Sequence, residues 1–415
     1  MRIILLSVLL LFIPFWADAF DFEVNGIYYN IISKEAKTCE VTYRDQISSH
    51  YYGDVILKEE AKYQGVTYKV TRIKSNAFYG QNRLSSIIIP NSISTIGEYA
   101  FYECLALKSI TFPDNLEMIG QYAFYYCNQL KTVKLPNSVK SIGCFAFGQC
   151  ERLEEITIPN SLQTIEHGTF YNCYALTSVE LPNSMTTIGA RSFSGCKNLV
   201  SVSMPQRLES IGESAFEETK IEAVILPSTV EIIENGAFSI CKDLKSIILP
   251  ITMKAIGSRA FSGCKSLETI EIPENVITLE SYVLGGCTNL QKVKIPSSIT
   301  SIDKTAFINT DNISQIISFI QEPFDIDEEC FSDKVYNSAV LTIPFGKKDV
   351  YKQAQGWKNF IHVVNNDIPS SIMKNDIYPK LIHKSYSPNG KTQNGITKGV
   401  NIVISKGKTR KLLVK

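Results

Sequence analysis

The residues whose type and spacing could do chemistry in this sequence are its cysteines. The 415-residue chain has 11, and most stand behind a phenylalanine, as in AFYYC at 123–127 and AFGQC at 146–150. A thiol at a fixed interval can be a metal ligand, half of a disulfide, a reactive nucleophile or a small buried apolar side chain. One recurring position is shared by Cys104, Cys127, Cys150, Cys173, Cys196, Cys241, Cys264 and Cys287.

The spacing of this cysteine column argues against chemistry. Metal sites gather cysteines and histidines over a few residues, whereas these thiols are 23 residues apart and the four histidines fall outside their register. Thr219 and Thr310 replace the cysteine twice. Disulfides between neighbouring units are the alternative, but parallel side chains in one file point the same way. We therefore predict buried free thiols, and regard Cys39, Cys144 and Cys330, outside the column, as the better candidates for a bridge or a reactive thiol.

A phenylalanine and a proline keep the same interval as the cysteines. Each column advances by 23 residues, except for one step of 22 between Phe216 and Phe238, and together they define ten complete units. The phenylalanine column is Phe78, Phe101, Phe124, Phe147, Phe170, Phe193, Phe216, Phe238, Phe261 and Phe307, with Leu284 in the one gap. The proline column is Pro90, Pro113, Pro136, Pro159, Pro182, Pro205, Pro227, Pro250, Pro273 and Pro296.

Each unit predicts a short strand followed by turns. In LKSITFP at 107–113, Ile110 and Phe112 alternate with polar residues, which is the period of a strand with one buried face. Pro113 ends the strand because proline has no N–H for a ladder. One unit cannot bury its apolar face alone, but stacked units can. The sequence therefore predicts a repeat solenoid with parallel strands joined by short helical or turn segments.

The spacing A-F-x-x-C…L-x-x-I-x-I-P…I-G, repeated over more than half of the chain, resembles the BspA-like class of leucine-rich repeat proteins. The resemblance implies a right-handed leucine-rich-repeat horseshoe with a β-rich N-terminal cap. It also implies adhesion to host or neighbouring-cell components, matrix proteins among them.

The flanking sequences differ in character from the repeats. Residues 1–19 contain Arg2, an apolar run and a final Ala-Asp-Ala, which is the pattern of a secretory signal peptide. LTIP at 341–344 restates the repeat strand, and the stretch that follows predicts a short amphipathic helix over the end of the core. The expected segments are 1–19, signal peptide; 20–72, β-rich N-terminal cap; 73–310, the ten-unit array; 311–365, C-terminal capping repeat and helix; 366–384, linker; and 385–415, a C-terminal module.

The module at 385–415 resembles the C-terminal segments of exported Bacteroidetes proteins, which are associated with secretion or surface attachment. The alternative is a solvated basic tail, because residues 374–415 hold ten Lys or Arg against Asp376 alone. The residues that match the family pattern are Tyr386, Gly390, Lys391, Lys398, Gly399, Val400, Asn401, Ile402, Lys411, Leu413, Val414 and Lys415.

The composition argues against several classes of function. The 42 Lys and Arg nearly balance the 41 Asp and Glu, so no overall field recruits nucleic acid. No second apolar run follows the N-terminal one at the length of a membrane span. The sequence also lacks a nucleophile elbow, an H-E-x-x-H motif, a P-loop and a dinucleotide-binding glycine pattern. We therefore expect a protein that is not an enzyme and that has no cofactor, metal, nucleic-acid partner or transmembrane span.

Strand positions that point away from the core predict a binding surface. Two such columns lie five and seven residues after the cysteine position. The first carries mostly small hydroxyls, and the second mixes hydroxyl, charged and apolar residues. Curved solenoids use such surfaces for binding, although the same residues also simply favour strands. The candidate surface consists of Ser109, Thr111, Thr132, Lys134, Glu155, Thr157, Ser178, Glu180, Ser201, Ser203, Ile225, Ile248, Glu271 and Lys294.

Tyrosines gather in the first five units, where later units have Ser or Gly. We favour packing between adjacent turns for these rings, with recognition of a partner as the alternative, since a tyrosine offers contact area with a polar tip. They are Tyr79, Tyr99, Tyr102, Tyr122, Tyr125, Tyr126, Tyr171 and Tyr174.

These features predict an exported protein, at the cell surface or extracellular, that binds a protein or another macromolecule on its solenoid surface. The alternative is a glycan-binding or scaffold component of a bacterial surface complex, also non-catalytic.

Overall fold

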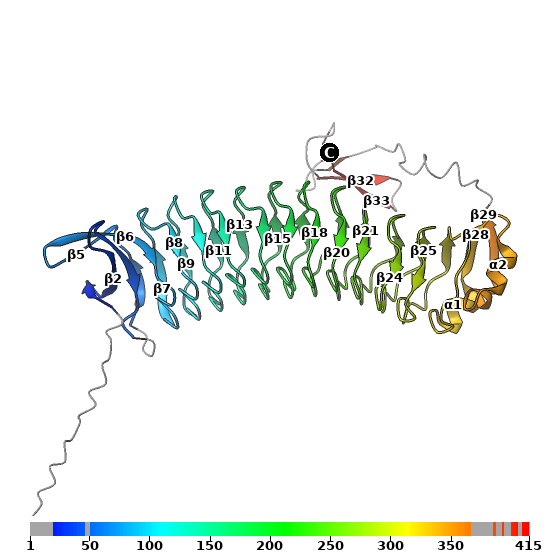
Figure 1. The fold of residues 1–415 in the computed structure, drawn as a ribbon, viewed down its shortest axis with the longest axis horizontal. Coiled ribbons are helices and arrows are strands. Elements are labelled where there is room, and N and C mark those ends of the chain that lie inside the picture. Colours follow the sequence, from blue (N-terminus) through cyan, green and yellow to red (C-terminus); the bar gives the residue numbers. More distant parts are fainter. Residues whose placement is uncertain are drawn as a thin grey trace, which may run out of the picture.

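A long solenoid dominates the computed structural model, which describes residues 20–45, residues 50–366 and four short strands between 385 and 414. The solenoid forms a shallow arc (Figure 1). Each unit contributes one strand to each of two rows, and neighbouring units pair in parallel within a row. The predicted repeat solenoid with parallel strands is confirmed.

The first row is built from the I-x-I-P segments. Its strands follow chain order and pair in parallel within four separate groups. In a pair of repeats, residues 23 apart face each other, as Ser86 faces Ser109 and Thr269 faces Lys292. The row consists of β4 (Tyr52–Ile56), β7 (Arg83–Ile88), β9 (Ser109–Thr111), β11 (Thr132–Lys134), β13 (Glu155–Thr157), β15 (Ser178–Glu180), β17 (Ser201–Ser203), β19 (Ala223–Ile225), β21 (Ser246–Ile248), β23 (Thr269–Glu271), β25 (Lys292–Ile295), β27 (Gln315–Ser318), β28 (Val340–Pro344) and β29 (His362–Asn366).

The second row lies after the proline turn of each unit. Its strands are mostly two residues long, with one buried isoleucine or leucine each. The row consists of β6 (Val66–Ile73), β8 (Thr95–Ile96), β10 (Met118–Ile119), β12 (Ser141–Ile142), β14 (Thr164–Ile165), β16 (Thr187–Ile188), β18 (Ser210–Ile211), β20 (Ile232–Ile233), β22 (Ala255–Ile256), β24 (Thr278–Leu279) and β26 (Ser301–Ile302).

The core is a ladder of phenylalanine rings that runs along the solenoid. From Phe78 to Phe261 each ring lies nearly parallel to the next, with centroids 4.8 to 5.9 Å apart. The exact repeat length causes this stacking, because it places the same side chain in each layer. Leu284 interrupts the ladder, and Phe307 resumes it against Phe331 at 4.7 Å.

The N-terminal segment continues the second row. Strands β1 (Phe22–Val24), β2 (Ile27–Ser33) and β3 (Thr38–Thr42) form an antiparallel meander. Strand β3 then pairs in parallel with β6, which also forms a hairpin with β5 (Glu60–Tyr63). Because Ile73 of β6 faces Ile96 of β8, the meander and the repeats form one continuous sheet here.

The C-terminal end of the solenoid differs from the predicted single helix. The stretch after β28 forms α2 (Lys348–Gln353) and the short 3-10 helix η1 (Trp357–Asn359), separated by Gly356 with a φ of 76°. Helix α1 (Asp333–Ser338) was not predicted. Tyr351 and Trp357 are nevertheless buried as expected for residues that close the core.

Beyond residue 366 the structure describes one antiparallel sheet. Its strands are β30 (Ser385–Tyr386), β31 (Thr392–Gln393), β32 (Val400–Ser405) and β33 (Thr409–Val414), in the order β31-β30-β32-β33. The predicted signal peptide and residues 367–384 of the predicted linker lie outside the described residues. No helix in the described ranges combines the length and hydrophobicity needed to span a bilayer.

Candidate binding surfaces

The predicted strand surface lies on the outward face of the first row. Its residues align in two columns across adjacent strands, so that Thr132 faces Glu155 and Glu180 faces Ser203. From β7 to β25 no residue of either column is buried. Three of the predicted residues, Ser203, Ile225 and Lys294, are only half-exposed. The structure therefore brings all fourteen candidates onto one face of the row.

One ion pair and two apolar pairs interrupt the hydroxyl residues of this face. Glu271 and Lys294 form an ion pair at 2.9 Å across β23 and β25, and Ile225 faces Ile248, whose side chain is exposed. A second apolar pair, Ile56 and Ile88, joins β4 to β7 and is also exposed. Sequence analysis missed Ile56, because β4 precedes the first repeat and carries no repeat motif.

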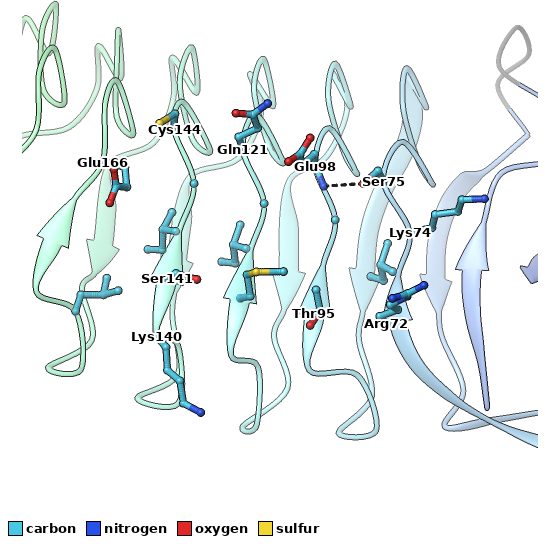
Figure 2. Close-up of a pocket in the computed structure, with 18 of the residues that line it drawn as sticks. Arg72, Lys74, Ser75, Thr95, Glu98, Gln121, Lys140, Ser141, Cys144 and Glu166 are labelled. Carbon is cyan, nitrogen blue, oxygen red and sulfur yellow. Dashed lines mark hydrogen bonds between the residues drawn. The ribbon is translucent and has the colours of Figure 1, made fainter. Parts of the chain in front are cut away.

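A groove of about 700 Å³ crosses the second row over the first five units. Thr95, Met118 and Ser141 line it on the strand side. The opposite side is formed by Ser75, Glu98, Gln121 and Cys144, which lie in successive units at the start of each turn (Figure 2). The sequence analysis did not find this groove, although the recurring I-G pair marks it.

The recurring glycine makes the groove. A Cβ on Gly120 would lie 2.6 Å from the backbone nitrogen of Glu98, and one on Gly143 would lie 2.4 Å from that of Gln121. These glycines have ordinary negative φ values or extended backbone, so close approach of adjacent units, not dihedral freedom, requires them. The glycines add no side chain along the floor of the groove, so the adjacent strands of the second row stay accessible.

Charged residues mark both ends of the groove. At one end the buried Glu40 carboxylate accepts a 2.6 Å hydrogen bond from Arg72 and lies 3.9 Å from the Lys74 ammonium. At the other end Glu166 replaces the glycine and accepts a hydrogen bond from the Thr164 hydroxyl at 2.9 Å. The middle of the groove holds Glu98, whose backbone N–H donates to the Ser75 hydroxyl (Figure 2).

The early tyrosines form one aromatic cluster on the edge where the F-x-x-C turns lie. The rings stack in register between units, as Tyr79 on Tyr102 at 5.0 Å and Tyr99 on Tyr122 at 5.0 Å. The prediction of packing is confirmed, and the rings remain at least partly exposed. The cluster comprises Tyr79, Tyr99, Tyr102, Tyr122, Tyr125, Tyr126, Phe145, His167 and Tyr171.

The sequence analysis missed two members of the cluster and misplaced one tyrosine. Phe145 stacks on Tyr122 at 5.1 Å, and His167 follows at 4.9 Å. Phe145 occupies the position of Tyr99 in a later unit, so the 23-residue register could have found it. His167 lies one residue before that position, which holds Gly168 in its unit. Tyr174 makes no ring contact among the described residues and instead lies under the Lys197 ammonium at 5.4 Å.

Partial burial alters the acidity of these phenols. Burial raises the pKa of Tyr79 and Tyr102, and the nearby Glu103 carboxylate raises both further. The pKa of Tyr125 rises to about 12, again mainly through burial. The hydroxyls therefore stay neutral at physiological pH and can donate or accept hydrogen bonds.

The cysteine column is buried and its thiols are free, as predicted. Each Sγ–H donates to the carbonyl oxygen of the phenylalanine in the preceding unit, with S···O distances of 3.0 to 3.3 Å. Burial raises the pKa of every thiol in the column, to about 12 for Cys150 and Cys196. Outside the column, Cys39 and Cys330 are also buried, and only Cys144, which lines the groove, is half-exposed.

These thiols show no arrangement for catalysis. A reactive cysteine has a lowered pKa and solvent access, and the column has neither. Within the residues that the structure describes, no group of three or more metal-ligating side chains comes together. The column instead gives each layer an apolar side chain that also bonds to a backbone carbonyl.

Solved structures of bacterial proteins resemble this chain. A leucine-rich repeat protein from Bacteroides ovatus is 26% identical, with a TM-score of 0.45 over 72% of this chain and 94% of that one. A leucine rich cell surface protein from Faecalibacterium prausnitzii is 23% identical, with a TM-score of 0.48 over 85% and 96%. The pneumococcal vaccine antigen PcpA is 20% identical, with a TM-score of 0.54 over 84% and 98%, and has the same fold. A comparison with curated proteins finds no match.

A family model identifies the repeats directly. The model of the BspA type leucine rich repeat region matches with six copies, over residues 61–173, 117–242 and 210–338. The matched residues include the whole phenylalanine ladder and both strand rows of the array. Because the matches together span more than half of the chain, the chain belongs to the BspA-type leucine-rich repeat family.

Proposed function

We propose that the chain is an exported, non-catalytic repeat scaffold that binds a protein or another macromolecule outside the cell. The observation that carries this proposal is the outward face of the first row, which stays exposed or half-exposed from β7 to β25. At about 4.8 Å per strand this face extends for roughly 45 Å. An exposed, repetitive surface of this length suits a large partner better than a small molecule.

The composition of the face supports a protein partner. Short hydroxyl residues such as Thr132 and Ser178 offer hydrogen bonds with little loss of side-chain entropy, and the apolar pairs Ile225–Ile248 and Ile56–Ile88 add local contact area. Membership of a leucine-rich repeat family agrees with such a role. Adhesion to host or neighbouring-cell macromolecules is the specific form that we propose.

Export is proposed from the N-terminal sequence, with its basic residue, apolar run and small-residue cleavage site. Surface attachment or secretion through residues 385–415 is proposed from their sequence pattern. Cell fractionation with and without residues 385–415 tests both. A full-length protein that stays in the cytoplasm would contradict export, and an unchanged distribution of the truncated chain would contradict the sorting role.

A glycan-binding role is the second candidate, favoured by the aromatic cluster. Sugars stack on open ring faces, yet several ring faces in the cluster are covered by a stacked neighbouring ring, such as Tyr99 by Tyr122. The strand face of the ten repeats contributes no aromatic side chain to either outward column. The geometry therefore supports a protein partner more strongly.

The proposed binding can be tested with the mature full-length chain on arrays of extracellular matrix proteins and glycans. A variant that carries Thr132→Arg and Ser178→Arg places two bulky charges on the strand face. Its control, Thr187→Arg, adds the same side chain on the second row. We expect protein binding that the double variant loses and the control keeps. Binding to glycans alone, or to neither class, would overturn the proposal.

A further inference from the structure

The aromatic cluster ends at a ring whose second face has no aromatic neighbour among the described residues. Tyr122 covers one face of Tyr99, with centroids 5.0 Å apart and planes 8° from parallel. On the other side, one unit earlier at the same repeat position, stands Asn76. Tyr79, which contacts the neighbouring Tyr102, is 42% exposed at the same end of the cluster. The row of stacked rings therefore ends at Asn76, where a shorter polar side chain takes the place of a ring, and we call this position the gap.

The chain fills the same gap elsewhere with an arginine. Tyr282 occupies the repeat position of Tyr99, and Arg259 occupies that of Asn76. The Arg259 guanidinium carbon lies 5.0 Å from the centroid of the Tyr282 ring. The backbones match as well, since Arg259 and Asn76 have φ values of 59° and 63°, and Tyr282 and Tyr99 of 55° and 54°. This geometry shows that a guanidinium fits over a tyrosine at this position of the solenoid.

The charges around the gap favour a cation. Glu98 precedes Tyr99, and Glu103 lies close enough to Tyr79 and Tyr102 to raise the pKa of both phenols. Neither carboxylate forms an ion pair within the described residues. Elsewhere on the surface, glutamates pair with a lysine one unit away, as Glu154 pairs with Lys131 at 3.4 Å.

The turns around the gap also lack cations of their own. Residues 75–82, 98–106 and 121–129 contain no lysine or arginine, and Lys74, which directly precedes the first of these turns, lies 3.9 Å from the Glu40 carboxylate. Most of the corresponding turns of later units do, although 167–175 and 281–289 do not, and several have a lysine directly after the cysteine position. Those lysines are Lys197, Lys220, Lys242 and Lys265. The early turns thus present rings and carboxylates that form no ion pair among the described residues, at positions where most later turns carry a lysine or an arginine.

We propose that the face of Tyr99 above Asn76 is a docking site for an arginine side chain of a partner protein, with Glu98 and Glu103 as its counter-charges. A planar guanidinium can stack on the ring while its N–H groups remain free to donate to a carboxylate, which an ammonium does less well. This inference rests on the protein-binding function proposed above and adds the chemistry of one contact. It concerns the turn edge, not the strand face.

The experiment uses the mature full-length chain and two labelled peptides, acetyl-(Gly-Gly-Arg)₃-amide and its citrulline counterpart, in fluorescence anisotropy at low salt. Citrulline keeps the shape of arginine but removes the charge. We expect the arginine peptide to bind at least tenfold more tightly than the citrulline peptide. Equal binding of both peptides, or binding of neither, would overturn the inference.

Two variants locate the site. Asn76→Arg supplies the cation from within the chain, as Arg259 does for Tyr282, and should weaken peptide binding at least tenfold. Its control, Ser214→Arg, adds the same charge at the same repeat position, where φ is also positive and the next unit offers Gly236 instead of a ring; it should change binding less than twofold. If both variants lose peptide affinity equally, the loss comes from the added net charge, and the proposed site is refuted.

A third substitution tests the counter-charges. Glu98→Gln keeps the size of the side chain and should weaken binding of the arginine peptide several-fold without affecting the citrulline peptide. An unchanged affinity would contradict the assigned role of Glu98. If the peptide results are negative while matrix proteins still bind on the array, this inference fails and the proposed function stands.

Discussion

Alkaline pH should unfold this protein far more readily than an ordinary protein, because its core is lined with protonated thiols. Burial raises the pKa of all eight thiols in the cysteine column above the ordinary value of 9.0. In the unfolded chain the same thiols ionise near pH 9. The folded state therefore holds protons that the unfolded state releases, and stability falls as pH rises above 9.

The magnitude follows from linkage. One unit above the unfolded pKa, each thiol that stays protonated in the folded state lowers the free energy of unfolding by about 1.4 kcal/mol. Eight thiols give about 11 kcal/mol at pH 10, which is comparable to the whole stability of a typical domain, about 5–15 kcal/mol. We therefore expect the solenoid to unfold between pH 9 and pH 10.5.

Far-UV circular dichroism as a function of pH would detect the transition, and potentiometric titration would count the protons. Unfolding at pH 10 should release about seven protons from the cysteine column. The matched variant replaces Cys127 and Cys150 by threonine, the residue found in the column at 219 and 310. It should release about two protons fewer and lose about 3 kcal/mol less between pH 8 and pH 10.

A fold that persists to pH 11 would refute the reasoning. So would a transition whose proton release is the same in the variant as in the parent chain. Either result would mean that the thiols are not the groups whose burial controls alkaline stability.

Three further predictions concern single residues. At pH 8 a thiol reagent should label only Cys144 in the folded chain and all 11 cysteines after denaturation; rapid labelling of several thiols in the folded state would contradict the buried column. Cys127→Ala should lower the free energy of unfolding by roughly 1–2 kcal/mol, measured by urea denaturation, and leave binding intact. Gly120→Ala should destabilise by roughly 1–3 kcal/mol because its Cβ meets the backbone of the preceding unit, whereas Glu166→Ala, in the same column, should have little effect.

The repeat architecture could be predicted because each unit contacts only its neighbours along the chain. A fixed interval of 23 residues brings each Phe, Cys and Pro beside its equivalents, so the columns of the sequence become columns of the structure. Strand β4 (Tyr52–Ile56) falls within the predicted β-rich cap, but its pairing with β7 was not predicted because that pairing depends on contacts outside the repeat. The predicted helix after β28 breaks at Gly356, where the Cβ position would lie 2.4 Å from the Ile326 side chain; this close packing across the cap is a tertiary effect.

The surfaces were less predictable than the core. Alternation assigned the outward columns of the first row correctly, since a strand has a period of two. The groove depends instead on how closely adjacent units approach at Gly97, Gly120 and Gly143, a distance that sequence spacing does not contain. The stacking of Tyr99 on Tyr122 was expected, but the gap above Asn76 was visible only when Arg259 and Tyr282 supplied an internal comparison.

The backbone of the aromatic cluster separates what the turn of each unit requires from what the rings add. Tyr99, Tyr122 and Phe145 all have φ values between 53° and 54°, a conformation that costs a residue with a side chain about 1–2 kcal/mol relative to glycine. The same position holds glycine at 168 and 236, so the fold does not require a ring there. Ring stacking offsets part of this cost, yet the rings remain half-exposed. Asn76, Arg191, Ser214, Arg259 and Tyr282 share this positive φ in the same column. The strain therefore belongs to the turn of each unit, and only the stacked rings distinguish the early units from the later ones.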